Sequence, residues 1–85
     1  IKNSIHPQTH PELYAGNSLG LAAISHQEGN LKEAEHKYKR ITLFCNKYDI
    51  RTWKYKALVG LGAAQWHLNK MEQAERTFKQ ALQTA

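Results

Sequence analysis

The sequence predicts an all-α fold, an α-solenoid of two stacked hairpins with four antiparallel helices behind an extended N-terminal leader. Apolar residues recur at three- and four-residue intervals, β-branched residues are few, and no segment alternates strictly. The two prolines, Pro7 and Pro11, lie near the N-terminus, so no proline interrupts a helix beyond them. The chain also repeats itself at a spacing of about 40 residues, which is typical of stacked helical hairpins.

Length and composition limit the classes of function. A chain of 85 residues is at most one small domain. Such a chain buries only about 60–65% of its unfolded surface, too little for a deep active site, so we expect no enzyme and no catalytic residues. The single cysteine excludes an internal disulfide and a multi-cysteine zinc site, and favours a reducing, intracellular, cytoplasmic location. No apolar run approaches the ~18 residues of a membrane span, so we expect no membrane association.

The first helix is expected to begin near Pro11. Residues 1–10 are polar and without periodicity, which indicates an extended leader. Thr9, followed three residues later by Glu12, resembles a capping box, with Pro11 in the first turn. The apolar stripe of this helix is expected to comprise Leu13, Tyr14, Asn17, Leu21, Ala22 and Ile24.

Turn residues predict where the other helices begin and end. Gly29 favours a left-handed end to the first helix, and Asn30 with Glu33 is a second candidate capping box. The second helix is expected to end near Lys47, and Asp49 to cap the third. The expected stripes are Leu31, Ala34, Tyr38, Ile41 and Cys45 in the second helix, Trp53, Ala57, Leu58, Leu61, Ala64 and Leu68 in the third, and Met71, Ala74, Phe78, Ala81 and Leu82 in the fourth.

The internal repeat sets the domain organisation. Tyr38 matches Phe78, and Gly29 matches Asn69, the other residue that tolerates a left-handed conformation. Identical pairs are Gly20 and Gly60, Leu21 and Leu61, Ala23 and Ala63, Ala34 and Ala74, Glu35 and Glu75, and Lys39 and Lys79. We expect a leader over 1–10, a first hairpin over 11–48 and a second over 49–85. A generic four-helix bundle with a chance repeat stays open as the alternative.

The repeat resembles the tetratricopeptide (TPR) pattern. The second unit carries Leu58-x2-Leu61-Gly62 and Ala74-x3-Phe78-x2-Ala81, and the first carries Leu21-Ala22, Gly29, Ala34-x3-Tyr38 and Ile41. The unit exceeds the usual length of about 34 residues, and the extra residues lie between Ile41 and Lys56. In this it is similar to the TPR subclass of LGN/Pins-type adaptors, rapsyn, kinesin light chains and bacterial Rap-like regulators.

The resemblance implies a protein-interaction module that needs no cofactor. TPR domains hold a partner peptide or helix in a groove lined by the first helix of each hairpin. The corresponding residues here, which we name the candidate groove, are Leu19, Gly20, Ala23, His26, Gln27, Lys56, Val59, Gly60, Ala63, Trp66 and His67. A second interpretation stays open, in which Leu19, Val59 and the glycines only permit close helix crossing and Trp66 only packs between repeats.

One known TPR specificity is not expected. The carboxylate clamp for Hsp70 and Hsp90 tails uses Lys and Asn on this face. Here Leu19, Ala23 and Gly60 stand in the corresponding places, and only Lys56 resembles a clamp residue. We therefore do not expect this chain to bind those tails.

A basic stretch over 36–56 is the second candidate surface. Its cations are Lys37, Lys39, Arg40, Lys47, Arg51, Lys54 and Lys56, against Asp49 as the one acid. Interleaved aromatic residues permit binding of single-stranded nucleic acid, an acidic protein is another candidate partner, and a solvated face is the third interpretation. Nucleic acid is the least favoured partner, because no recognised RNA-binding motif is present.

Other features predict no metal site and an open end. Pro7 separates His6 from His10. His26 and His67 could both lie near one end of the candidate groove, but they are expected to have no nearby cysteine and no convergent carboxylate. Cys45 lies on an apolar stripe, which predicts a buried, inert thiol. Two units are fewer than the three or so that such stacks need, so self-association through the uncapped C-terminal hairpin is a further expectation.

Overall fold

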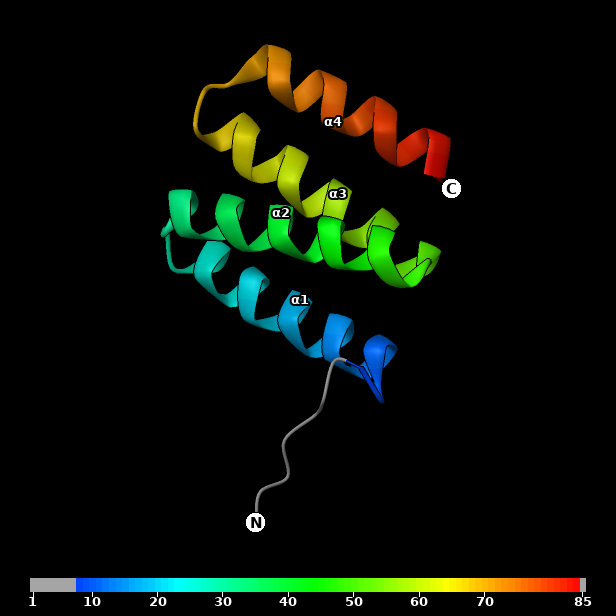
Figure 1. The fold of residues 1–85 in the computed structure, drawn as a ribbon. Coiled ribbons are helices and arrows are strands. Elements are labelled where there is room, and N and C mark those ends of the chain that lie inside the picture. The colour runs from blue at the N-terminus through cyan, green and yellow to red at the C-terminus, as the bar shows by residue number, and fades with distance from the viewer. Residues whose placement is uncertain (1–7, 85) are drawn as a thin grey trace.

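The computed structural model describes residues 8–84, and that part of the chain consists of four α-helices and contains no strand. The helices are α1 (Pro11–Gln27), α2 (Leu31–Tyr48), α3 (Arg51–His67) and α4 (Met71–Thr84). Each helix runs antiparallel to the one before it, and Figure 1 shows them lying one above another in chain order. The prediction of an all-α chain of four helices is confirmed, while most of the predicted leader lies outside the described residues.

Helix contacts follow the order of the chain. Helix α2 packs against α1 and α3, and α3 also packs against α1 and α4. Within the described part of the chain, α4 contacts α3 alone. The molecule measures 42 × 29 × 13 Å along its principal axes, so it is flat in one direction. One side of α4 is therefore left uncovered by the described helices.

The core-facing side of α1 differs from the predicted stripe. Ala15 and Ala22 are fully buried, whereas Leu13, Leu21 and Ile24 are 61%, 52% and 51% exposed. Small side chains on the core side let α2 approach α1 closely, and the larger ones lie on a side that none of the described helices covers. The prediction was wrong for these three residues, because three- and four-residue spacing marks a face without saying what covers it.

The other stripes are largely confirmed. Buried members are Ala34, Tyr38, Ile41 and Cys45 in α2, Ala57, Leu58, Leu61 and Ala64 in α3, and Ala74 and Ala81 in α4. Half-buried members are Leu31, Trp53, Leu68 and Phe78, while Met71 and Leu82 are exposed. The core is therefore built mainly from α2 and α3, and α4 contributes small residues at its edge.

The ends of α1 and α3 have the same turn conformation at matched positions. Gly29 and Asn69 both have left-handed backbones, with φ of 86° and 65°. Asp49 corrects a prediction, because its left-handed φ of 56° closes α2, and Ile50 is the N-cap of α3. An aspartate tolerates this conformation, which lets the Ile50 amide donate to the Cys45 carbonyl at 3.0 Å.

The starts of α1 and α2 differ from the predicted capping boxes. The N-cap residue of α1 is His10 rather than Thr9. Asn30 is the N-cap of α2, as predicted, but its side chain makes no cap hydrogen bond. The Glu33 carboxylate instead accepts a hydrogen bond from Ser25 and pairs with Lys37. The hydrogen bond from Ser25 ties α1 to α2.

Two glycines place α3 between aromatic rings. A Cβ at Gly60 would clash with the Tyr38 ring from α2, and a Cβ at Gly62 would clash with the Phe78 ring from α4. Each glycine therefore allows a ring to lie directly against the α3 backbone. The Tyr38 ring lies between α2 and α3 and also meets His26 of α1.

Candidate functional site

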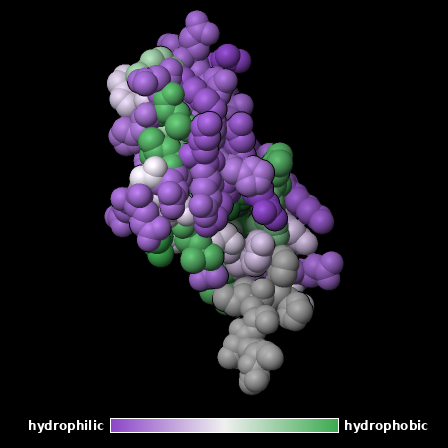
Figure 2. All heavy atoms as spheres, turned by 90° about the vertical axis from the view of Figure 1, so that its left-hand side faces the viewer, coloured by the Kyte–Doolittle hydropathy of each residue, from purple (hydrophilic) through white to green (hydrophobic). Residues whose placement is uncertain are grey.

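The candidate groove lies on α1 and α3, two helices that contact each other. None of its residues is buried. Exposed members are Gly20, Ala23, Gln27, Lys56, Val59, Trp66 and His67, and half-buried members are Leu19, His26, Gly60 and Ala63. Figure 2 views the molecule from the end where α1 and α3 finish, and shows hydrophilic side chains over most of this end with hydrophobic patches along its edges.

Close helix packing explains some residues of the candidate groove but not others. Gly60 lies against the Tyr38 ring and Leu19 packs against the core, so close packing accounts for both. A Cβ at Gly20, in contrast, would meet nothing within 4 Å. Val59 and Trp66 are 38% and 55% exposed, so core packing does not account for these apolar side chains either.

Two groove histidines meet at the ends of α1 and α3. His26 Nε2 lies 3.0 Å from His67 Nδ1, and the two ring planes are 72° apart. The His26 ring also meets the Tyr38 ring edge-on, at a centroid distance of 6.1 Å. Partial burial, and secondarily the neighbouring His67, lower the pKa of His26 below its ordinary value. The sequence predicts both residues near one end of the groove, but residue spacing carries no information on their direct contact.

The basic stretch is divided among several surfaces. Lys37 and Arg40 line a hollow of about 250 Å³ between α1 and α2. Lys56 lies in the candidate groove, with Nζ 5.3 Å from the centre of the Trp53 ring. Lys47 Nζ lies 5.5 Å from the centre of the Tyr48 ring. The seven cations therefore do not form one continuous track.

The other three cations of the stretch line a larger hollow, which we name the basic cleft. It has a volume of about 820 Å³ and is bordered by α2, α3 and α4. Its polar lining comprises Lys39, Thr42, Asn46, Asp49, Arg51, Lys54, Gln80, Gln83 and Thr84. Cations and amide side chains together favour an acidic or strongly polar ligand over an apolar one.

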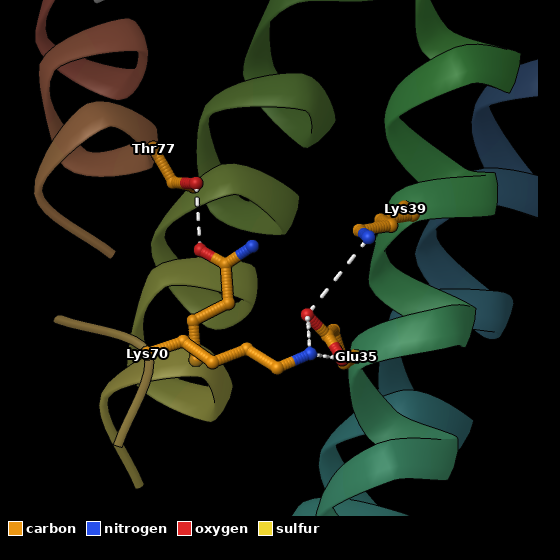
Figure 3. Close-up of polar contacts among 5 residues, drawn as sticks. Glu35, Lys39, Lys70 and Thr77 are labelled. Atoms are coloured by element: carbon orange, nitrogen blue, oxygen red, sulfur yellow. Dashed lines mark hydrogen bonds and ion pairs between the residues drawn. The ribbon is translucent and has the colours of Figure 1, made fainter. Parts of the chain in front are cut away.

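A polar network that the sequence analysis missed ties the second hairpin to the first. Lys70, in the α3–α4 turn, donates from Nζ to both carboxylate oxygens of Glu35 on α2, at 2.9 and 3.1 Å (Figure 3). Lys39 stands 3.8 Å from the same carboxylate. On α4, the Thr77 hydroxyl donates to Gln65 Oε1 at 2.7 Å. The repeat alignment marks Glu35 through its match with Glu75, but gives no sign that Lys70 reaches it.

Opposing effects set the acidity of Glu35. Burial of this carboxyl raises its pKa, but the hydrogen bond and charge of Lys70, assisted by Lys39 and Gln65, outweigh burial and hold the pKa below its ordinary value. The ionised, paired form is therefore favoured in the folded chain. This ion pair joins α2 to the α3–α4 turn.

The described residues also bear on metal binding, thiol reactivity and membrane spanning. Residues 8–84 contain no group of three or more His, Cys, Asp or Glu side chains placed to hold a metal ion. Cys45 is buried, and burial raises the pKa of its thiol, with Lys54 acting in the opposite direction. None of the four described helices combines the length and apolar character needed to cross a bilayer.

Comparison of the chain with models of known protein families, with curated proteins and with solved structures gives no match in any of the three.

Proposed function

We propose that this chain is a TPR-type α-solenoid segment of two hairpins, which binds a peptide or helix of a partner protein through the candidate groove. The arrangement of α4 supports this, because within residues 8–84 it contacts α3 alone and does not close back onto α1 as in a four-helix bundle. The matched turns at Gly29 and Asn69, and the matched aromatics Tyr38 and Phe78, support two equivalent units.

The exposed small and apolar surface of the groove is the observation that carries the proposal. Gly20 and Ala23 on α1 offer a low surface with open space above Gly20. Val59 and Trp66 on α3 leave apolar side chains in solvent beside them. A partner helix can approach such a surface closely and place apolar anchors spaced three or four residues apart on it. Tryptophan, the residue at position 66, is one of the residue types enriched among the anchors of interfaces.

A displayed library of random peptides provides the probe for the experiment. Selected peptides are titrated into the ¹⁵N-labelled chain, and amide shifts are mapped onto α1 and α3. We expect the shifts to gather at Ala23, Val59 and Ala63, and Val59→Glu to weaken binding at least tenfold. Leu82→Glu, on the exposed side of α4, is the matched control and should leave affinity unchanged. Shifts confined to the basic cleft, or equal effects of the two variants, would contradict the proposal.

Binding of an acidic partner in the basic cleft is the second candidate function. It is supported by Lys39, Arg51 and Lys54 around one hollow of about 820 Å³. Titrations with a Glu-rich peptide and with a single-stranded oligouridine separate the two charged probes. If the cleft is the site, affinity falls steeply with salt and Lys54→Glu abolishes it, whereas groove binding is nearly insensitive to salt. Nucleic acid is the less supported probe, because the cations lie on separate surfaces.

An architectural role through self-association is the third candidate. Leu82 on α4 is 73% exposed, and Leu13, Leu21 and Ile24 are exposed at the other end of the stack. Contacts between copies through these ends would bury apolar surface that the described helices leave open. Sedimentation over a wide concentration range tests this, since a monomer at every concentration excludes the role.

A further inference from the structure

Two imidazoles from different hairpins converge at one end of the candidate groove. His26 and His67 stand forty-one positions apart in the chain, yet their Nε2 and Nδ1 atoms are 3.0 Å apart. One of these nitrogens donates and the other accepts in the neutral pair. His67 is exposed and His26 is half-buried, so solvent reaches the pair.

The separation of these nitrogens is close to that of two metal ligands. Two imidazole nitrogens bound to one cation at 2.0–2.1 Å, with a near-tetrahedral angle, stand about 3.3 Å apart. A movement of about 0.3 Å, which the exposed His67 side chain can provide, reaches that distance. The proton between the rings transfers through solvent to the other nitrogen of its own ring, which frees both facing lone pairs without net proton release.

We propose that His26 and His67 together bind a late first-row divalent cation, Cu²⁺, Ni²⁺ or Zn²⁺, and thereby link α1 to α3. Imidazole ligands favour these ions over Mg²⁺ and Ca²⁺, which prefer oxygen. Because the described residues add no third His, Cys, Asp or Glu to the site, water or a side chain of a bound partner completes the coordination. The sequence predicts no metal site here, and the contact between the two rings is what changes that interpretation.

The site stands independently of partner binding, because both ligands belong to this chain. It would remain if the candidate groove had no partner.

The experiment uses a chain in which the other three histidines are removed. The sequence has five histidines, and the variant with His6, His10 and His36 changed to Gln keeps only the proposed pair. We expect Cu²⁺ to bind this variant at one equivalent, with an electron paramagnetic resonance spectrum that shows two nitrogen ligands. We also expect Ni²⁺ and Zn²⁺ to raise its Tm by several degrees in a concentration-dependent manner, with no rise from Mg²⁺.

Adding His67→Gln to that variant tests the pair directly. Metal binding should weaken at least tenfold, the Tm rise should disappear, and the spectrum should show at most one nitrogen. The metal-free circular dichroism of the two variants checks that both remain helical. If either lacks helical structure, the nitrogen count in the wild-type chain, before and after His67→Gln alone, replaces the Tm comparison. No binding by the pair-only variant, or unchanged binding after loss of His67, would overturn the proposal.

Discussion

Matched residues of the two hairpins have different environments. The Glu35 side chain is 8% exposed and pairs with Lys70 at 2.9 Å, whereas its counterpart Glu75 is 70% exposed and has Lys79 at 3.8 Å. Tyr38 is buried, whereas its counterpart Phe78 is half-buried. At both of these pairs of matched positions, the residue of the first hairpin is buried and the residue of the second is partly or largely exposed. The difference arises because the second hairpin covers the first, while the described residues place nothing over the second.

The largest single effect is expected at the two matched aromatic residues. Tyr38→Ala removes a buried ring that lies against Gly60 and His26, and should lower the free energy of unfolding by about 3–5 kcal/mol. Phe78→Ala should cost less, about 1–3 kcal/mol, because part of that ring is already in solvent. Urea unfolding followed by circular dichroism measures both. Equal losses would show that the two hairpins are not asymmetric in packing.

The next difference is one of sign, at two matched glycines. Gly60→Ala places a methyl group against the Tyr38 ring and should destabilise the chain by about 1–2 kcal/mol, after the gain in helix propensity is subtracted. Gly20→Ala meets open space and should stabilise α1 by about 0.5–1 kcal/mol. Thermal unfolding of the two variants gives the comparison. A destabilising Gly20→Ala would mean that this part of α1 is covered in solution.

The matched glutamates should differ less. Glu35→Ala leaves the ammonium of Lys70 without its buried partner and should cost about 1.5–3 kcal/mol for the lost charged hydrogen bonds, with solvent around Lys70 favouring the lower end. Glu75→Ala should change the free energy of unfolding by less than about 0.5 kcal/mol. Lys70→Met is a useful companion variant. If Glu35→Ala is as mild as Glu75→Ala, the ion pair does not hold the hairpins together.

The smallest effect is expected in the dependence of stability on pH. The pKa of His26 is lowered in the folded chain from its ordinary value of 6.5, so the unfolded chain binds the proton more readily. The contribution of His26 to the free energy of unfolding is fully present above pH 6.5. It is lost as the pH falls from 6.5 through the lower pKa of the folded chain. The Glu35 contribution is lost only below its ordinary value of 4.5. Just below pH 6.5, the free energy of unfolding of His26→Gln should therefore fall less steeply with decreasing pH than that of the wild type. In more acidic solution the two chains should lose stability equally.

The sequence alone was sufficient to predict the four helices and two of the turns between them. Helical periodicity depends on local spacing, and the left-handed turns at Gly29 and Asn69 depend on local residue type, so both can be predicted without tertiary information. Asp49 shows the limit of that reasoning, because aspartate suits both an N-cap and a left-handed helix end. The choice between them is made by how α2 and α3 pack.

Contacts between helices were beyond the reach of the sequence. The burial of Ala15 in place of Leu13 depends on which side of α1 the next helix takes. The ion pair of Glu35 and the contact of His26 with His67 depend on the relative shift of helices along their axes, to within about an ångström. A single sequence records neither quantity. The positions of the candidate groove come from the resemblance alone, and its binding role stays a prediction.

The attachment of α4 to one helix has a consequence for how the molecule opens. Amide protons in α2 and α3 exchange with solvent only when helices on two sides move apart. Among residues 8–84, α4 can separate through the loss of its interface with α3 alone. Such an opening would expose the face of α3 around Gly62 while Tyr38 and Gly60 stay in contact. The chain is therefore expected to unfold in order from its C-terminal helix, and its hydrogen-exchange protection should decrease from α2 and α3 toward α4.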